Sequence, residues 1–253
     1  MNNYRSSPFS SIPPVVKNLL IINVIFFIAT HILGNDRQFP LLVQHLAVYY
    51  FDSPAFKVWQ IITYMFMHSP NSLMHILFNM FALFSFGPVL EYTFGSKRFL
   101  NFYLITGLGA LALQMIVQAI EVYGITGSIT NPNAVTIDFA TNSAALNIQG
   151  LSAEAGAKLR DIYAMPMLGA SGAIFGILIA FGMLFPNAEL ILLFIPVPIK
   201  AKYLIPGYIV LELFLGVKQF SGDSVAHFAH LGGALFGFLL IKYWNIRRPG
   251  GFI

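Results

Sequence analysis

The stretch Gly169-Ala-Ser-Gly-Ala-Ile-Phe-Gly176 opens a long apolar segment and sets one serine among small residues. Small residues at three- and four-residue spacing let helices approach closely in lipid, where tight packing drives helix association. A lone serine in such a run is more often a packing residue than a reactive one. The meaning of Ser171 therefore depends on which other polar residues the chain brings to the same place.

The composition indicates a membrane protein. Of the 253 residues, 57% are hydrophobic and 9% are charged, and the mean hydropathy is +0.73. Ordinary soluble domains contain about 25% charged residues. One water-soluble core could not bury this much apolar surface, so the solvent is a bilayer. The length predicts a single domain over residues 1–253, with several spans and no second soluble module.

The charge and the residue types exclude several functions. The sequence pI is about 9.3, but the basic residues are scattered in short connections, so we expect no nucleic-acid partner. The chain has no cysteine, which excludes disulfides, thiolate nucleophiles and cysteine-based metal sites. We expect no metal and no cofactor. The N-terminus lacks a small-residue cleavage signature, and we expect it to be retained.

Six apolar segments meet or approach the length of a bilayer-spanning helix, roughly 17–25 residues. We predict spans at residues 15–33, 73–90, 99–120, 167–185, 203–217 and 225–244. The aromatic-rich segment 35–72 is placed at the membrane interface. Residues 121–165 form a polar connection with a short helix at 151–163. The run 190–199 is short and contains two prolines, so we expect it not to span.

The basic residues predict the orientation of these spans. With the N-terminus inside, the inner connections hold nine of the fourteen Lys and Arg residues. The positive-inside rule therefore favours both termini on the cytosolic side. The second, fourth and sixth spans then all enter from outside, which places His75, Ser171 and His230 at a similar depth below the outer surface.

Ser171 and His230 form the first candidate pair. The sixth segment carries Gly233-xxx-Gly237, so two helices with small faces could meet and bring the serine and the histidine within hydrogen-bond reach, as in a nucleophile with its base. His230 alone could equally be a polar residue that holds two helices together. His227 competes with it, but we expect His227 to be half exposed near the outer mouth.

His75 and Asn79 form the second candidate pair. They are four residues apart and share one face of their helix. Two such donors could stabilise the oxyanion of a tetrahedral intermediate. Interhelical hydrogen bonding explains this pair equally well in isolation.

Other chemistries find less support. A His-Glu-x-x-His metalloprotease motif and a glycine-rich phosphate loop are absent from the sequence. Glu212 is the one acid that we place inside a span, and without an acidic partner it does not support an aspartyl mechanism. Together with Pro206 in the fifth segment, it raises the alternative of a small-solute transporter or channel.

Taken together, these motifs resemble the rhomboid family of intramembrane serine proteases, over roughly Val15 to Trp244. Gly169-Ala-Ser-Gly is similar to the nucleophile motif of the family. Ala229-His-Leu-Gly-Gly-Ala-Leu-Phe-Gly237 is similar to its sixth-span histidine motif, and His75-xxx-Asn79 to its second-span motif. Each motif is weak alone, but all three occur in the right order and on the right spans.

The resemblance implies an all-α, six-helix rhomboid-like bundle with both termini cytosolic. It implies Ser171 as nucleophile and His230 as general base, in a dyad without a third carboxylate. It implies an oxyanion hole of His75, Asn79 and the backbone N–H of Ser171. The residues expected to pack around the site are Gly169, Gly172, Phe175, Gly176, Gly233 and Gly237. The expected substrates are single-span membrane proteins, cut near the outer end of their helix, and the expected location is a bacterial inner membrane.

Some features depart from the family pattern. Gln60 stands where many members carry arginine, and Phe175 stands where tyrosine is common, although its ring could still stack on His230. The connection 121–165 is unusually long and has no assigned role. A catalytically inactive rhomboid-like protein that binds membrane helices is the main alternative to a protease.

Overall fold

The computed structural model describes residues 12–34, 40–192, 195–218 and 226–246. Six longer helices run through this part of the chain: α1 (Pro14–Leu33), α4 (Leu73–Phe94), α5 (Ser96–Thr126), α7 (Ser171–Leu184), α8 (Ala201–Lys218) and α9 (His227–Tyr243). The shorter helices are α2 (Leu41–Leu46), α3 (Gln60–Thr63), the 3-10 helix η2 (Tyr64–Phe66) and α6 (Ala153–Ala164). Two antiparallel hairpins join β1 (Val135–Asp138) to β2 (Ser143–Leu146) and β3 (Glu189–Leu192) to β4 (Ile195–Lys200). The fold is therefore mostly helical rather than all-α.

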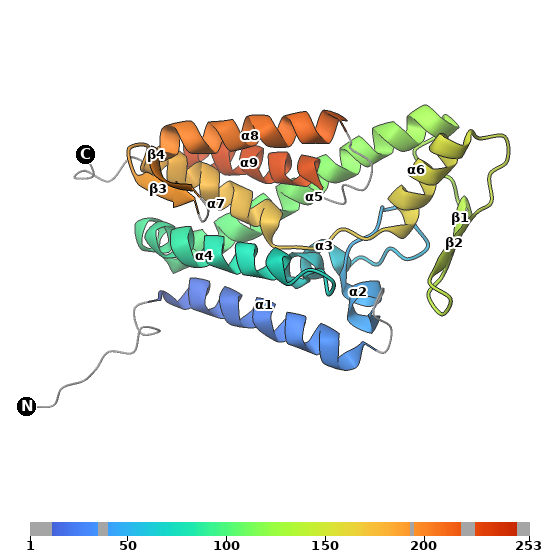
Figure 1. The fold of residues 1–253 in the computed structure, drawn as a ribbon, viewed down its shortest axis with the longest axis horizontal. Coiled ribbons are helices and arrows are strands. Elements are labelled where there is room, and N and C mark those ends of the chain that lie inside the picture. Colours follow the sequence, from blue (N-terminus) through green and yellow to red (C-terminus); the bar gives the residue numbers. More distant parts are fainter. Residues whose placement is uncertain (1–11, 35–39, 193–194, 219–225, 247–253) are drawn as a thin grey trace, which may run out of the picture.

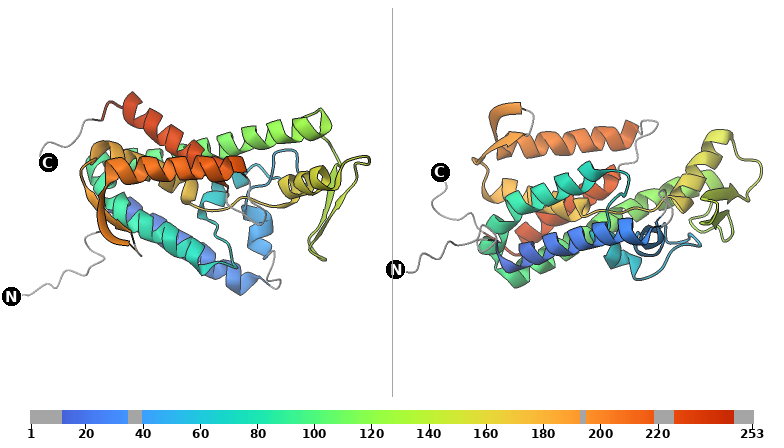
Figure 2. Two further views of the ribbon diagram at one scale, coloured as in Figure 1. Left: turned by 45° about the horizontal axis from the view of Figure 1, so that its top comes forward. Right: turned by 60° about the horizontal axis from the view of Figure 1, so that its bottom comes forward.

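The six longer helices lie side by side and alternate in direction (Figure 1). The starts of α4, α7 and α9 lie at one end of the bundle, and the start of α1 and the end of α9 lie at the other. Figure 2 shows α8 on the outside of the bundle. In agreement, its buried residues are few: Ala201, Ile205, Glu212 and Gly216.

Three helices, α1, α4 and α5, are long and apolar enough to cross a membrane, and α7 is apolar but only 14 residues long. Large apolar side chains face outward on several helices, for example Ile25 on α1, Phe81 on α4 and Val210 on α8. Such surfaces suit lipid rather than water. All six predicted segments coincide with helices, and their ends differ by between none and six residues.

The start of α7 differs from the prediction for a local reason. Met167 exchanges two backbone hydrogen bonds with Val48, of 2.8 and 2.9 Å. The N–H of Gly169 donates to the carbonyl of Tyr64 at 3.0 Å, and Gly169 has φ +132°. These contacts keep residues 167–169 extended, so the helix begins at Ser171 instead of residue 167.

The expected ends of α4 and α5 also move outward. α4 continues through Pro88 to Phe94 and stops at Gly95, where φ is +78°. α5 is 31 residues long and ends at Gly127, in the left-handed conformation that glycine adopts without strain. Glu91 therefore lies inside a helix, and it is 2% exposed. Glu212 is thus not the only acid within the helical bundle.

Glu91 fastens the start of α1 to the end of α4. Its carboxylate accepts hydrogen bonds from the backbone N–H of Val15 (3.1 Å) and Val16 (2.8 Å), and from the hydroxyl of Ser96 (2.6 Å). The first N–H groups of a helix have no acceptor within the helix, and a negative charge there is favourable. Glu91 supplies both the acceptor and the charge.

Glu91→Gln should therefore destabilise the fold. The variant loses the charge at the start of α1 and keeps only one strong acceptor, so we expect a loss of about 1.5–3 kcal/mol. Thermal unfolding in detergent would measure it as a lower Tm. An unchanged Tm would contradict this role of the carboxylate. The starts of α7 and α9 lie at the far end of the bundle and should be unaffected.

The long connection 121–165 packs with the segment after α1 as one small unit. Val122, Val135 and Leu159 are buried in one cluster with Tyr50 and Tyr163. The carboxylate of Asp52, at Oδ2, accepts from the hydroxyl of Tyr163 at 2.8 Å and from the backbone N–H of Asn131 at 2.6 Å. The predicted short helix at 151–163 is α6, whereas the β1–β2 hairpin was not predicted. This connection thus supports the end of α5 and the loops near the starts of α4 and α7.

Gln60 anchors the loop that precedes α3. It is fully buried. Its side-chain oxygen accepts from the N–H of Lys57 at 2.9 Å, and its amide donates to the carbonyls of Ala55 (3.1 Å) and His45 (3.4 Å). The indole N–H of Trp59 donates to the same His45 carbonyl at 2.8 Å. The uncharged amide of Gln60 therefore forms hydrogen bonds with the buried backbone groups of this loop.

Candidate active site

Ser171 stands at the first residue of α7, and its hydroxyl faces His230. The distance from Ser171 Oγ to His230 Nε2 is 2.9 Å. Because Ser171 begins a helix, its own N–H has no intrahelical acceptor and is available to a ligand. The small residues around Ser171 leave room for His230 to approach it. Ser171 and His230 are 59 residues apart in sequence. The pair that the motifs predicted is thus brought together.

The ring of His230 is held in place by stacking. His230 lies in the first turn of α9, and its ring is parallel to that of Phe175, with centroids 4.3 Å apart and an interplanar angle of 9°. Phe175 also contacts Tyr208 of α8, at 5.0 Å between centroids. The expectation that phenylalanine can stack on the histidine is confirmed. The stack limits rotation of the imidazole, so its Nε2 stays directed at Ser171.

Glycines bring α7 and α9 into backbone contact. A Cβ on Gly233 would overlap the carbonyl group of Gly172, and a Cβ on Gly237 would lie 2.8 Å from the Cα of Gly176. A real Cβ does not approach this closely, so side chains at these positions would force the helices apart. The prediction that two small-residue faces meet is confirmed. This contact sets the distance between the serine and the histidine.

A carboxylate stands beside the histidine, contrary to the expected dyad without an acid. Oε2 of Glu212, on α8, lies 2.8 Å from His230 Nδ1. The residue is 3% exposed. The prediction failed because Glu212 and His230 belong to different helices, and no motif joins them. The available signal was the acid itself, since an ionisable residue in an apolar segment is a functional candidate.

His227 is also placed differently from the expectation. It is 7% exposed rather than half exposed. Its Nδ1 lies 2.7 Å from the same Oε2 atom of Glu212. His227 and His230 are three residues apart and share one face of α9. His227 therefore does not compete for Ser171, because both histidines reach the same carboxylate and only His230 reaches the serine.

His75 approaches the serine from α4. Its Nδ1 accepts from the backbone N–H of Ser69 at 3.4 Å, so its proton is on Nε2. That Nε2 lies 3.0 Å from the position that a Cβ on Gly169 would take, and Ser171 Oγ lies 3.5 Å from the same position. Only glycine leaves this space open. His75 can therefore direct an N–H into the space beside the serine.

Asn79 lies one turn further along α4 and is 6% exposed. Its side-chain amide donates one hydrogen to the carbonyl of His75 at 2.9 Å, and an amide has a second hydrogen.

His68 packs edge-on against His75, with centroids 5.1 Å apart. Burial, followed by the nearby ionisable ring of His75, lowers the pKa of His68 to about 3. The His68 ring is therefore neutral.

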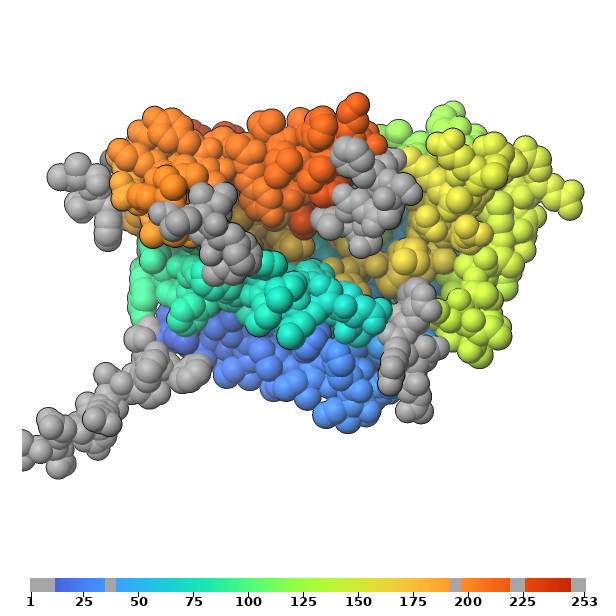
Figure 3. Space-filling model, in the orientation of Figure 1, coloured from blue at the N-terminus to red at the C-terminus, as the bar shows by residue number. Residues whose placement is uncertain are grey.

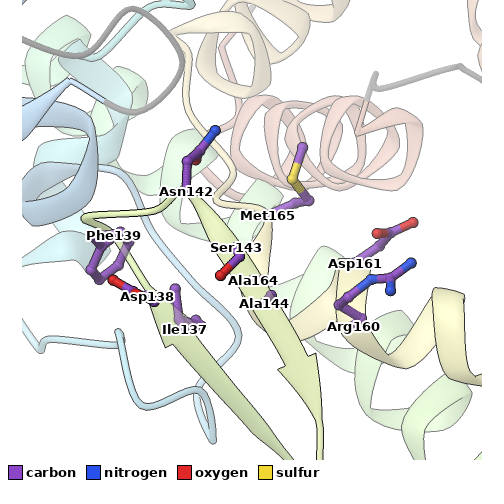
Figure 4. A pocket seen from close by; sticks show the side chains of 10 residues that line it. All are labelled: Ile137, Asp138, Phe139, Asn142, Ser143, Ala144, Arg160, Asp161, Ala164 and Met165. Atoms are coloured by element: carbon purple, nitrogen blue, oxygen red, sulfur yellow. The ribbon is translucent and has the colours of Figure 1, made fainter.

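The site does not coincide with the cavity beside the β1–β2 hairpin. That cavity has a volume of 320 Å³ and lies between the hairpin and α6, where Asp138, Ser143, Arg160 and Asp161 line it (Figure 4). It lacks Ser171, His75 and His230. Figure 3 shows instead that the surface is hollowed between α4 and α8, over α7. The hollow runs along the helix that begins with Ser171.

Comparison with known proteins agrees with these motifs. Residues 55–245 match the model of the rhomboid domain. The chain is 27% identical to an uncharacterised mitochondrial rhomboid protein of Schizosaccharomyces pombe, over 96% of this chain and 68% of that protein. It is 30% identical to the mitochondrial rhomboid-like protein 12 of Arabidopsis thaliana, over 94% and 60%. It is 26% identical to the human mitochondrial presenilin-associated rhomboid-like protein, over 92% and 50%.

These relatives overturn one prediction. All three are mitochondrial proteins, so the placement in a bacterial inner membrane is wrong. No residue in the sequence supported the predicted location, because basic loops orient a chain in a bacterial and in a mitochondrial membrane alike. The chain spans about half to two thirds of the length of these relatives. With a rhomboid-domain match over most of its length and the serine and histidine motifs in contact, the chain belongs to the rhomboid family.

Proposed function

We propose that this chain is an intramembrane serine endopeptidase that cleaves single-span membrane proteins. The observation that carries the proposal is the 2.9 Å contact between Ser171 Oγ and His230 Nε2, at the start of two helices and beside the donor of His75. A serine is a weak nucleophile until a base accepts its proton. The contact has the length and direction that this transfer requires.

The reaction follows from these positions. Ser171 Oγ attacks the carbonyl carbon of the substrate while its proton moves to Nε2 of His230. The oxyanion that forms accepts hydrogen bonds from the Ser171 N–H, from His75 Nε2 and from the free hydrogen of the Asn79 amide. His230 then gives the proton to the nitrogen of the departing amine, and the peptide bond breaks. A water molecule, deprotonated by His230, hydrolyses the ester and restores Ser171.

The substrate class and the membrane setting are part of the proposal. Six alternating helices with the start of α1 and the end of α9 at one end support six crossings with both termini on one side. The hollow between α4 and α8 suits a helix that arrives from the lipid. The mitochondrial relatives favour the mitochondrial inner membrane, where we place the chain.

The experiment that tests the proposal uses the purified chain in liposomes with a single-span reporter. The reporter carries a fluorophore at each end and small residues near one end of its helix. We expect cleavage into two products, with the cut near the end of the helix, as mapped by mass spectrometry. A folded protein that binds the reporter without cutting it would instead favour the catalytically inactive helix-binding alternative.

Asn79→Ala should slow the chemical step selectively. The variant removes one donor to the oxyanion, and such a donor contributes about 100- to 1,000-fold to kcat. The oxyanion exists only in the transition state and intermediate, so KM should change little. Steady-state kinetics with the reporter separates the two constants. A rise in KM at unchanged kcat would place Asn79 in substrate binding instead.

A further inference from the structure

One oxygen atom joins two buried histidines beside the serine. Glu212 Oε2 is 2.7 Å from His227 Nδ1 and 2.8 Å from His230 Nδ1, and the three residues are 3%, 7% and 9% exposed. We propose that Glu212, held by His227, is the positioning residue that prepares His230 to act as a base. The proposal rests on the proposed function, because it concerns how that function is carried out.

Glu212 determines which ring nitrogen of His230 carries the proton. A neutral imidazole carries one N–H, and a carboxylate oxygen only accepts. The contact with Glu212 therefore places the proton on Nδ1. The lone pair is then on Nε2, which faces Ser171 Oγ at 2.9 Å. In the opposite tautomer, Nε2 would carry the proton and could not accept one from the serine. The carboxylate thus selects the reactive form.

The charge of Glu212 also stabilises the product of proton transfer. When Nε2 accepts the serine proton, His230 becomes an imidazolium cation. The negative charge of Glu212 is in direct contact with that cation, in a site from which water is largely excluded. Opposite charges attract more strongly in such a medium than in water. Glu212 therefore favours the protonated histidine that forms during attack.

His227 fixes the carboxylate in turn. It lies one turn before His230 on α9, and the two rings are perpendicular, with centroids 6.3 Å apart. A Cβ on Gly216 of α8 would lie 3.1 Å from the Cβ of His227, so the two helices are close here. The N–H of His227 holds Oε2 between the rings. The outer helix α8 is thereby joined to α9 at the level of the reactive pair.

Metal binding is the alternative for the same three side chains, whose ligand atoms lie within 4.8 Å of one another. Zinc binds nitrogen and oxygen at about 2.0–2.2 Å, which places tetrahedral ligands about 3.3 Å apart. The observed contacts of 2.7 and 2.8 Å are shorter and have the length of charge-assisted hydrogen bonds. The geometry therefore favours a proton between each pair of atoms.

The test compares two substitutions of Glu212 with a matched change at Glu91. Glu212→Gln keeps an amide oxygen that can accept both hydrogen bonds but removes the charge. Glu212→Leu removes both. We expect kcat and the rate of fluorophosphonate labelling of Ser171 to fall at least about 10-fold for the glutamine and further, up to about 10⁴-fold, for the leucine, with KM within about threefold. Glu91→Gln removes the charge of another buried acid and should label at the wild-type rate.

The outcomes distinguish this proposal from the proposed function. Wild-type protein that is not labelled at Ser171 would overturn the proposed function itself. If the wild type is labelled and both Glu212 variants are labelled at the wild-type rate, only the positioning role is overturned. A lower Tm with an unchanged labelling rate per folded molecule would do the same, since it reveals a purely structural contact.

A second measurement needs no Glu212 variant and so does not depend on its folding. The ring nitrogens of [15N]histidine-labelled wild-type protein report the tautomer by NMR, and His230→Gln identifies the signals of residue 230. We expect the proton on Nδ1 of His230. A proton on Nε2 would overturn the proposal.

Discussion

Replacing Ser171 with alanine should remove cleavage of a membrane-spanning reporter. The change deletes one oxygen atom and leaves the helix start and its neighbours in place. In serine hydrolases, loss of the nucleophile alone lowers kcat by about 10⁶-fold. We therefore expect product formation below detection, measured as fragments of a fluorescent reporter in liposomes.

The stability of the fold should change little in Ser171→Ala. Ser171 is only partly buried, and alanine is a better helix former than serine, so the Tm should stay within a few degrees of the wild type. Binding of the reporter should also persist, since the helical surfaces around the site are unchanged. Cleavage by the Ser171→Ala variant at the wild-type rate would rule out this serine as the nucleophile.

Replacing Gly233 with alanine should inactivate the site indirectly, by separating α9 from α7. A Cβ at residue 233 would overlap the carbonyl group of Gly172, and a backbone carbonyl cannot move aside as a flexible side chain does. The two helices must separate, at a cost of about 1–3 kcal/mol or more. His230 and Ser171 move with them, and a displacement of about 1 Å can lower the rate about 100-fold. We expect both a lower Tm and a kcat reduced at least 100-fold.

Gly124→Ala is the matched control for this prediction. It adds the same methyl group in α5, where no atom other than those of the adjoining helix backbone lies within 4 Å of the new Cβ. Alanine favours a helix over glycine by about 1 kcal/mol, so this control should be as stable as the wild type or more so, with normal activity. Equal behaviour of the two variants would mean that the contact between α7 and α9 does not set the site.

The features of the fold and the site that could be predicted from the sequence are mostly those encoded by local patterns. Apolar length placed the six helices, and the spacing of Gly233 and Gly237 placed α9 against α7. The contact of Ser171 with His230 followed from that packing. The stacking of Phe175 on His230 followed instead from the resemblance to the rhomboid family, in which this position often holds tyrosine. The helices and their packing needed only apolar length and a repeated small residue.

The parts that could not be predicted depend on contacts between distant segments. Glu212 reaches His230 from another helix, and nothing in their spacing encodes the rotation of α8 that turns the acid inward. The start of α7 depends on the pairing of Met167 with Val48, across more than a hundred residues. α4 continues past Pro88 and includes Glu91, whose carboxylate accepts a hydrogen bond from Val16 at the start of α1, 75 residues away.

The central claim is that Ser171 is an activated nucleophile, and a fluorophosphonate probe tests it most directly. The probe forms a covalent bond only with a serine whose oxygen is made reactive by a base. The wild-type protein in liposomes would be labelled, digested and mapped by mass spectrometry, with heat-unfolded protein as the control. We predict one modified serine, Ser171, in the folded protein and none after unfolding. Folded protein with an unmodified Ser171 would contradict the account.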